Sequence, residues 1–145
     1  MSPTPLSDEV PIVRRGAVAV IVRAGRLLVI RRSQHVIAPG LFCFPGGGIE
    51  PGETEQQAVV RELQEELGCA VRPLRRLWEN VSTWRVHLAW WLAEMDDTIT
   101  PVPNPSEVES FHWFTLDEMA ALADQLESNI HFLAALKRGE VSLSI

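Results

Sequence analysis

Three glutamates, Glu62, Glu65 and Glu66, stand close together in the segment RELQEEL. If this segment is helical, steps of three and four residues place the three carboxylates on one face. Each pair of like charges then destabilises the helix by about 0.2–0.5 kcal/mol, and Arg61 is a single basic partner for several acids. A divalent cation would offset this repulsion, because carboxylate oxygens suit Mg²⁺ or Mn²⁺, which also bind phosphates. On spacing alone, an acidic helix face exposed to solvent is the commoner arrangement.

A glycine-rich turn, Gly46-Gly47-Gly48, precedes these acids in the chain. Backbone without side chains can bring carbonyl oxygens to a metal ion and lets a phosphate approach closely. The turn alone is weak support for a site. Combined with the acids, it would let a protein of net charge −6 attract a polyphosphate through bound cations.

The segment that carries the acids has the start and stop signals of a helix. Thr54 followed by Gln57 fits a capping box, and Gly68 is placed as a C-terminal cap. An apolar stripe beside the acids would pack this helix against a core. The stripe consists of Ala58, Val59, Val60, Leu63 and Leu67.

The rest of the chain alternates between strand and helix patterns. Strands come first, then the acidic helix, then more strands and two further helices, which indicates a mixed sheet covered by helices. We therefore expect an α/β fold. The expected strands are Gly16–Arg32 with a turn at Ala24-Gly25, Leu41–Phe44, Arg75–Glu94 and Ser110–Phe114, and the expected later helices are Leu116–Leu126 and Ile130–Lys137.

The tryptophan-rich segment WRVHLAWWL reads as one strand with alternating faces. Alternation places Trp84 and Trp90 on the same face as Val86, Leu88 and Leu92. We expect Trp84, Trp90 and Trp91 to belong to the core, although one of them could also stack on a nucleobase.

Composition and charge exclude several classes of protein. A length of 145 residues fits one domain, expected at residues 13–145 after a loose polar leader at residues 1–12. A net charge of −6 argues against binding of a nucleic-acid duplex, and the chain has no apolar run of the ~20 residues that a membrane span needs. Cys43 and Cys69 lack metal-like spacing and are expected to be buried free thiols, which favours the cytoplasm.

The spacing of the glycine and the acids resembles the Nudix box, G-x5-E-x7-R-E-U-x-E-E-x-G-U, in which U is apolar. Gly47, Glu53 and Arg61–Gly68 occupy all of its fixed positions, and Cys69 stands where an aliphatic residue is usual. A pattern with this many fixed positions is rarely met by chance. The likeness extends more loosely through the opening hairpin and to Glu107, six residues before a tryptophan.

This resemblance implies a Nudix-type α/β/α sandwich and a Mg²⁺-dependent pyrophosphohydrolase, for which Mn²⁺ can substitute. The enzyme would cleave a nucleoside di- or triphosphate derivative through attack of metal-activated water on phosphorus. Glu62, Glu65 and Glu66 are then the metal ligands and catalytic acids, joined by the carbonyl of Gly47. Glu62 is also the expected general base, although the base differs between subfamilies.

Further roles follow from the same resemblance. Glu53 and Arg61 are expected to form an ion pair that fixes the glycine turn against the helix. Glu107 matches a position that offers a further metal ligand or the base, or it is an ordinary loop acid. Arg31 and Arg32 end the second strand, where they would either contact phosphate or point into solvent.

The substrate is less well defined than the reaction. The overall likeness is to MutT-type nucleoside triphosphate pyrophosphohydrolases, which release a monophosphate and pyrophosphate, and an oxidised purine nucleotide is a candidate. Asn129 matches a purine-recognising asparagine of that group, and its amide could pair with a base edge. The alternative, which we favour, is that Ser128 or Asn129 caps the helix expected to begin near Ile130.

Two other functions stay open. The same chemistry could act on ADP-ribose or a nucleotide sugar, or the chain could be a non-catalytic nucleotide-binding module. We favour the enzyme because an unused cluster of like charges destabilises a helix. The expected partner is a small-molecule nucleotide, and an edge strand or tryptophan face could support a homodimer.

Overall fold

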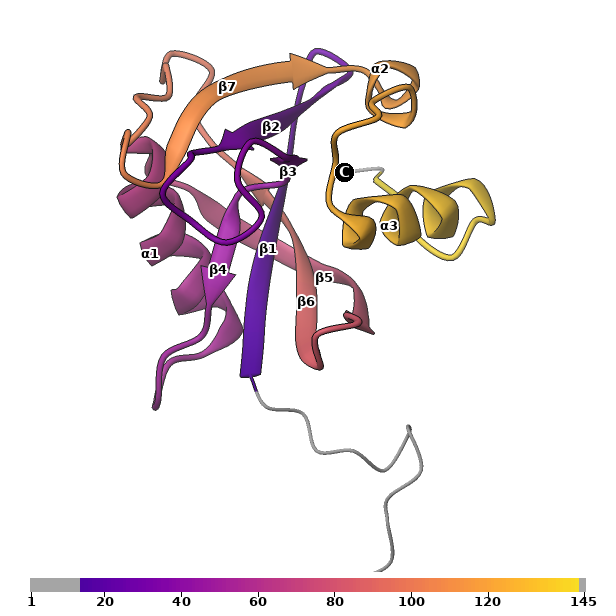
Figure 1. Ribbon diagram of the computed structural model, residues 1–145, viewed down its shortest axis with the longest axis horizontal. Helices are drawn as coiled ribbons and strands as arrows, with labels where there is room; N and C mark the ends of the chain where they lie inside the picture. Colours follow the sequence, from indigo (N-terminus) through magenta and orange to yellow (C-terminus); the bar gives the residue numbers. More distant parts are fainter. Residues whose placement is uncertain (1–13, 144–145) are drawn as a thin grey trace, which may run out of the picture.

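The computed structural model describes residues 14–143, so the expected leader at residues 1–12 lies outside the described part of the chain. A seven-stranded sheet runs through the middle of the protein. In Figure 1, α1 lies on one side of this sheet, and α3 lies on the other. The strands are β1 (Arg14–Arg23), β2 (Arg26–Arg32), β3 (Phe42–Cys43), β4 (Gly46–Gly48), β5 (Arg72–Val81), β6 (Val86–Glu94) and β7 (Val108–Phe114), and the helices are α1 (Glu55–Leu67), α2 (Leu116–Ala120) and α3 (Glu127–Lys137).

The sheet is mixed and has β1 at its centre. Its strand order is β3-β2-β1-β6-β5, with β4 also paired to β1 and β7 also paired to β2. Strands β1 and β6 run parallel, whereas the other described pairs are antiparallel. The predicted α/β class with a mixed sheet flanked by helices is confirmed.

The hairpin between β1 and β2 turns where the sequence predicts it. Ala24 and Gly25 have φ angles of 51° and 75°, so both turn residues lie in the left-handed region. Two such residues in a row are the pattern of a type I′ turn, whose twist matches that of the flanking strands.

Two apolar cores cover the two faces of the sheet. On one face, the fully buried Leu63 and Leu67 of α1 pack against β1, β2 and β6, whereas Val60 of the predicted apolar stripe is exposed. On the other face, Phe132 of α3 stacks on Trp90 of β6 with ring centroids 4.4 Å apart. These two layers make the sheet the middle of an α/β/α sandwich.

The two C-terminal helices differ from the predicted ranges. α2 ends at Ala120 instead of continuing to Leu126, and α3 begins at Glu127 instead of near Ile130. The physical reason is that the intervening backbone bonds to β3: the amide of Phe42 donates to the carbonyl of Asp124, and the amide of Leu126 donates to the carbonyl of Phe42. These bonds take the place of further helical turns.

The prediction that Trp84 belongs to the core is wrong. Strand β6 begins at Val86, so Trp84 lies in the preceding turn and remains 60% exposed. Trp90 is buried as predicted, and the partly buried Trp91 donates its indole N–H to Glu55 at 2.9 Å.

Two other expectations concern the cysteines and membrane-spanning segments. Cys43 and Cys69 are free and buried, which confirms the prediction for the thiols. Within residues 14–143, none of the helices has the length and apolar character needed to cross a bilayer.

Candidate active site

The glycine turn is itself a short strand that pairs with the centre of the sheet. β4 places Gly47 opposite Ala17 of β1. A Cβ on Gly46 would lie 2.2 Å from the carbonyl oxygen of Ala17, and a Cβ on Gly47 would lie 2.5–2.7 Å from the carboxyl atoms of Glu62. Glycine at these positions therefore lets one turn approach both the sheet and the acidic helix.

Helix α1 is fixed at both ends by the predicted caps. The hydroxyl of Thr54 accepts a hydrogen bond from the amide of Gln57 at 3.1 Å, and the Gln57 side chain accepts one from the amide of Thr54 at 2.9 Å. Gly68 ends the helix with a φ of 61°. These caps fix the start and the end of the helix that carries the glutamates.

A small acidic cavity of about 230 Å³ lies between the glycine turn and α1. It is lined by residues of β2, the loop after β2, β4, α1 and the loop before β7, which are far apart in the sequence. Five of the ten predicted site residues line this cavity, and the other five, which do not, are Arg31, Glu53, Arg61, Glu65 and Asn129. The lining residues are Ile30, Arg32, Val36, Gly46, Gly47, Glu62, Glu66 and Glu107.

Glu66 lies at the buried end of this cavity, with 7% of its surface exposed. One carboxylate oxygen accepts a hydrogen bond from the amide of Gly46 at 2.9 Å. Burial nevertheless raises the pKa of Glu66 to about 8, and the charges of Glu62 and Glu107 act in the same direction. Burial also raises the pKa of Glu62, against the opposing effect of Arg61.

Glu107 completes the acidic cavity from the loop before β7. Its Oε2 is buried and has no hydrogen-bond partner within the part of the chain that the structure describes. A buried carboxylate oxygen without a donor is unfavourable unless something else satisfies it. A cation is the simplest group that would do so beside two other acids.

Arg61 links the glycine turn to the acids as the sequence predicts. Its guanidinium donates to both carboxylate oxygens of Glu53, at 2.7 and 2.9 Å, and to the carbonyl oxygen of Gly48 at 2.8 Å. It also donates to Glu62 at 2.9 Å and to the half-exposed Glu65 at 3.2 Å. The bond to Arg61 is the main reason why the pKa of Glu53 falls to about 2.

The donor set fits a hard divalent cation. Carboxylate and carbonyl oxygens surround the cavity, Glu107 has an unpartnered oxygen, and Gly47 leaves its backbone open to approach. In the described residues 14–143, no three acidic, histidine or cysteine side chains already stand in a metal-holding arrangement. Arg61 binds Glu62 through Oε1 and Glu65 through Oε2, and a carboxylate bound through one oxygen can ligate a cation through the other.

The two neighbouring arginines at the end of β2 have different positions. Arg32 lines the acidic cavity, and its Nε donates to the carbonyl oxygen of Ile37 at 2.8 Å. Arg31 is held elsewhere, 3.4 Å from Glu109 and 3.0 Å from the carbonyl oxygen of Gly40. Only Arg32 is therefore placed to meet a phosphate in the acidic cavity.

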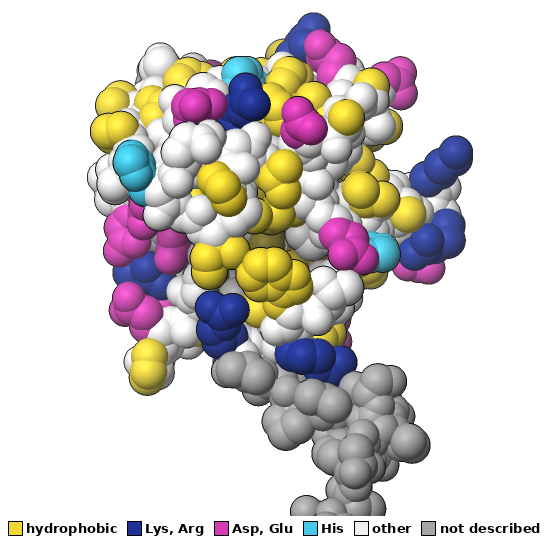
Figure 2. All heavy atoms as spheres, in the orientation of Figure 1, with side chains coloured by type: hydrophobic (Ala, Val, Ile, Leu, Met, Phe, Trp, Pro, Cys, Tyr) yellow, Lys and Arg dark blue, Asp and Glu magenta, His cyan; other side chains and the backbone are white. Residues whose placement is uncertain are grey.

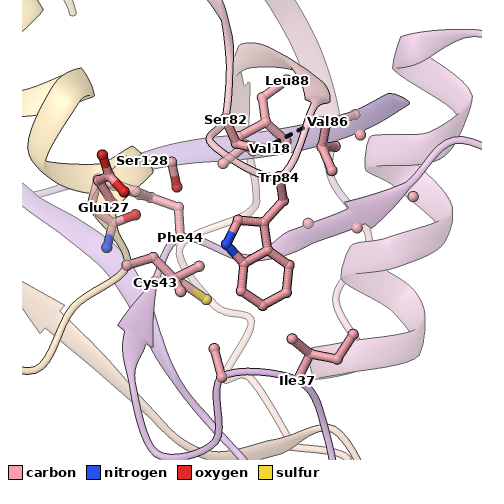
Figure 3. A pocket seen from close by; sticks show the side chains of 18 of the residues that line it. Val18, Ile37, Cys43, Phe44, Ser82, Trp84, Val86, Leu88, Glu127 and Ser128 are labelled. Carbon is pink, nitrogen blue, oxygen red and sulfur yellow. Dashed lines mark hydrogen bonds between the residues drawn. The ribbon is translucent and has the colours of Figure 1, made fainter. Parts of the chain in front are cut away.

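A larger apolar cavity of about 470 Å³ adjoins the acidic one, and the two share Arg32, Gly46 and Gly47. Figure 2 shows hydrophobic side chains around a hollow, with acidic side chains on both sides of it. Figure 3 shows the Trp84 indole extending into this cavity, with Cys43, Phe44 and Ile37 around it. The sequence analysis did not single out Ile37, and it placed Trp84 in the core because the turn before Val86 has no glycine, asparagine or proline to reveal it.

Asn129 lies in the wall of the apolar cavity and does not cap α3. The N-cap is Leu126, so Asn129 is already inside the helix, and the capping prediction is wrong. Its side chain is buried, and its Nδ2 donates to the carbonyl oxygen of Phe42 at 3.0 Å. This bond uses one of the two N–H donors of the amide, so the second N–H and the amide oxygen are the groups that can meet a ligand.

A comparison of the sequence with protein-family models identifies the family of this chain. The NUDIX domain family model matches residues 13–136 of this sequence. The chain belongs to the Nudix hydrolase family. The prediction of an enzyme of this family is thereby confirmed, and Nudix hydrolases generally use a divalent metal.

Individual relatives differ in their names and lengths. The Nudix chain is 37% identical over 110 residues to the NAD-capped RNA hydrolase NudC of Chromobacterium violaceum, covering 73% of this chain and 40% of that protein's length. It is 52% identical over 115 residues to the 8-oxo-dGTP diphosphatase of Escherichia coli, covering 77% of this chain and 86% of that protein. A MutT protein structure from Methanosarcina mazei shares the fold, with a TM-score of 0.75, 20% identity and coverage of 87% and 94%.

Proposed function

We propose that this Nudix hydrolase is a Mg²⁺-dependent pyrophosphohydrolase of the MutT type. It would cleave a nucleoside triphosphate, including an oxidised purine one, to the monophosphate and pyrophosphate. The observation that carries the proposal is the junction of the two cavities at Gly46, Gly47 and Arg32. A ligand with phosphates beside the acids would place its nucleoside in the apolar cavity.

The metal-holding residues in this proposal are the carbonyl of Gly47 and the carboxylates of Glu62, Glu65, Glu66 and Glu107. The unpartnered oxygen of Glu107 and the closeness of Gly47 to Glu62 support this assignment. When bound, the divalent cations supply positive charge to the phosphate oxygens and to the departing pyrophosphate.

The protein's own residues would position the reactants and move the proton. Glu62 accepts a proton from the attacking water, whose oxygen bonds to phosphorus as the phosphoanhydride bond breaks and pyrophosphate leaves. Burial raises the pKa of Glu62, which is the direction that suits a base near neutral pH. Arg61 holds Glu53 and the glycine turn in place, while Arg32 faces the phosphates.

The nucleoside is proposed to lie against Asn129, whose amide oxygen would accept a hydrogen bond from a base N–H. The name of the Escherichia coli relative, 8-oxo-dGTP diphosphatase, supports a purine triphosphate. NudC is named for a different substrate, and this chain spans only 40% of its length. We also propose that residues 13–145 act as one cytoplasmic domain, which the buried free thiols favour.

A nucleotide panel tests the substrate. We expect that dGTP and 8-oxo-dGTP, incubated with Mg²⁺, release pyrophosphate directly, with no orthophosphate until a pyrophosphatase is added. ADP-ribose and a nucleotide sugar serve as the competing substrates, and their products are scored as orthophosphate after phosphatase treatment. Faster turnover of either competitor would replace the triphosphate assignment, and no turnover of any would favour the non-catalytic module.

Substitutions of the glutamates test which residue is the general base. Glu62→Gln is expected to lower kcat about 10²–10⁴-fold, the usual contribution of general base catalysis, while the circular dichroism spectrum stays unchanged. Glu107→Gln should cause a smaller loss, which extra Mg²⁺ partly restores. The matched control is Glu109→Gln, an exposed acid at the start of β7 that lies outside both cavities. If Glu107→Gln abolishes turnover and Glu62→Gln does not, the base is Glu107.

A further inference from the structure

Two large hydrophobic side chains stand exposed at the apolar cavity. Among residues 14–143, eight large hydrophobic residues are exposed, and two of these, Trp84 at 60% and Ile37 at 56%, line the cavity. Single exposed hydrophobic residues are ordinary on a protein surface. Two of them in one cavity, from segments far apart in the sequence, give that cavity an apolar wall on two sides.

The turn before β6 holds Trp84 in a defined position. The amide of Ser82 donates to the carbonyl of Val86 at 2.9 Å, and the amide of Arg85 donates to the carbonyl of Ser82 at 3.0 Å. The amide of Val86 donates to the Ser82 hydroxyl at 3.2 Å. Arg85 has a φ of 60°, in the left-handed region that is unfavourable for a non-glycine residue. The turn thus keeps an unfavourable backbone conformation next to an exposed indole.

The opposite side of the cavity is tied to the phosphate end of the site. Arg32, which lines both cavities, donates to the carbonyl oxygen of Ile37 at 2.8 Å. The backbone of Ile37 is therefore anchored by the same residue that faces the acids. Figure 3 shows the flat Trp84 indole and the branched Ile37 side chain within the one cavity.

We propose that Trp84 and Ile37 form a clamp for the nucleobase of the substrate, with the base stacked on the Trp84 indole. This inference rests on the proposed function, because phosphates beside the acids place the base in this cavity. Every nucleobase has an aromatic face, so stacking supplies affinity without reading the base edge. A two-ring purine covers more of the indole than a one-ring pyrimidine, so the clamp favours purine nucleotides.

Equilibrium binding of product-like probes tests the clamp without turnover. GMP, CMP and ribose 5-phosphate are titrated by calorimetry into the wild-type protein and into Trp84→Ala, Trp84→Phe and Ile37→Ala. Trp84→Ala should weaken GMP binding about 5- to 150-fold, the range that ~1–3 kcal/mol of stacking corresponds to. Trp84→Phe should retain most of the affinity, and Ile37→Ala should lose part of it. CMP should bind more weakly than GMP to the wild type.

Val102→Ala is the matched control, because Val102 is exposed and lies outside both cavities. Its GMP affinity should equal that of the wild type, and ribose 5-phosphate should bind all variants equally. Equal GMP affinity of wild type and Trp84→Ala overturns the clamp, as does the absence of GMP binding by the wild type. An equal effect of Trp84→Ala on ribose 5-phosphate also overturns it, since that probe has no base.

Kinetics separate this inference from the proposed function. With dGTP and Mg²⁺, Trp84→Ala should raise KM and leave kcat within a few-fold of wild type, because the clamp does not contact the reacting phosphates. If the wild type releases pyrophosphate and the variant has an unchanged KM, only the clamp fails. If the wild type hydrolyses no nucleotide, the proposed function itself fails.

Discussion

Glu66 is the one charged side chain that is buried among residues 14–143. Its pKa of about 8 means that, without a cation, it holds a proton at neutral pH, and burial is the main cause. A bound divalent cation would favour the ionised form and release that proton. Metal binding and proton release are therefore coupled at this residue.

The stability of the metal-free protein should depend on pH through Glu66. Below the ordinary value of 4.5, the carboxyl is protonated in both folded and unfolded states, and its contribution to stability is fully present. Between 4.5 and about 8 only the folded state keeps the proton, so stability falls as pH rises, by up to about 1.4 kcal/mol per pH unit. The raised pKa of Glu62 acts in the same direction.

Urea unfolding at pH 5 and pH 8 measures this effect. We expect wild-type protein in EDTA to lose stability over this range and Glu66→Gln to lose clearly less, because glutamine does not titrate. The lowered pKa of Glu53 does not interfere, since both proteins carry that carboxyl and its contribution cancels in the comparison. If the free energy of unfolding changes equally with pH in the two proteins, Glu66 is not protonated in the folded state.

At the residue level, sequence reasoning was most successful where spacing alone defines geometry. The separations among Glu62, Glu65 and Glu66 predict a shared helix face, and the structure places Glu62 and Glu66 in one cavity. Arg31 and Arg32 have the same chemistry and adjacent positions, so the sequence does not distinguish them. Their different surroundings depend on the β2–β7 pairing, which shifts register between these two residues.

At the level of elements, three consecutive glycines of β4 face different constraints. Alanine at Gly46 would collide with the backbone of β1, and alanine at Gly47 would meet the end of the flexible Glu62 side chain. At Gly48 a Cβ would meet nothing within 4 Å. The absence of a side chain is thus required at Gly46 for strand pairing and at Gly47 to leave room for Glu62, whereas Gly48 meets neither constraint.

Alanine substitution should separate these roles. Gly47→Ala should displace the Glu62 carboxylate and lower kcat about a hundredfold, the scale of a 1 Å misplacement, with little change in the urea midpoint. Gly46→Ala should lower the urea midpoint by disrupting the β1–β4 pairing. Gly48→Ala is the control and should leave both measurements near wild type. Equal activity of Gly47→Ala and Gly48→Ala would contradict the close approach of the turn to Glu62.

Helix α1 and the first hairpin were predictable because their signals are local. The Thr54 box, Gly68 and the Ala24-Gly25 turn each act within a few residues. Trp84 was misplaced because strand alternation was extended through a turn that has no glycine, asparagine or proline. The early start of α3 depends on backbone bonds between Phe42 and residues 124–126, which no local pattern reveals.

At the scale of the whole molecule, cation binding should stabilise the fold. A ligand that binds only the folded state raises the free energy of unfolding by about 2.7 kcal/mol at one hundred times its Kd. We expect the thermal midpoint to rise with Mg²⁺ concentration in wild type and to rise much less in Glu66→Gln. Added Na⁺ at equal ionic strength is the control. A shift that is the same in both proteins would place the ion elsewhere.

In the proposed function, the two cavities would divide the chain between cleavage and selection of the substrate. The acids come from α1 and the loop before β7, whereas Ser82–Val86 and Ile37 form part of the apolar cavity. The two cavities share only three lining residues in the described part of the chain, Gly46, Gly47 and Arg32. Exchanging the Ser82–Val86 turn and the loop that carries Ile37 could therefore change the substrate of this hydrolase while leaving the acids of α1 in place.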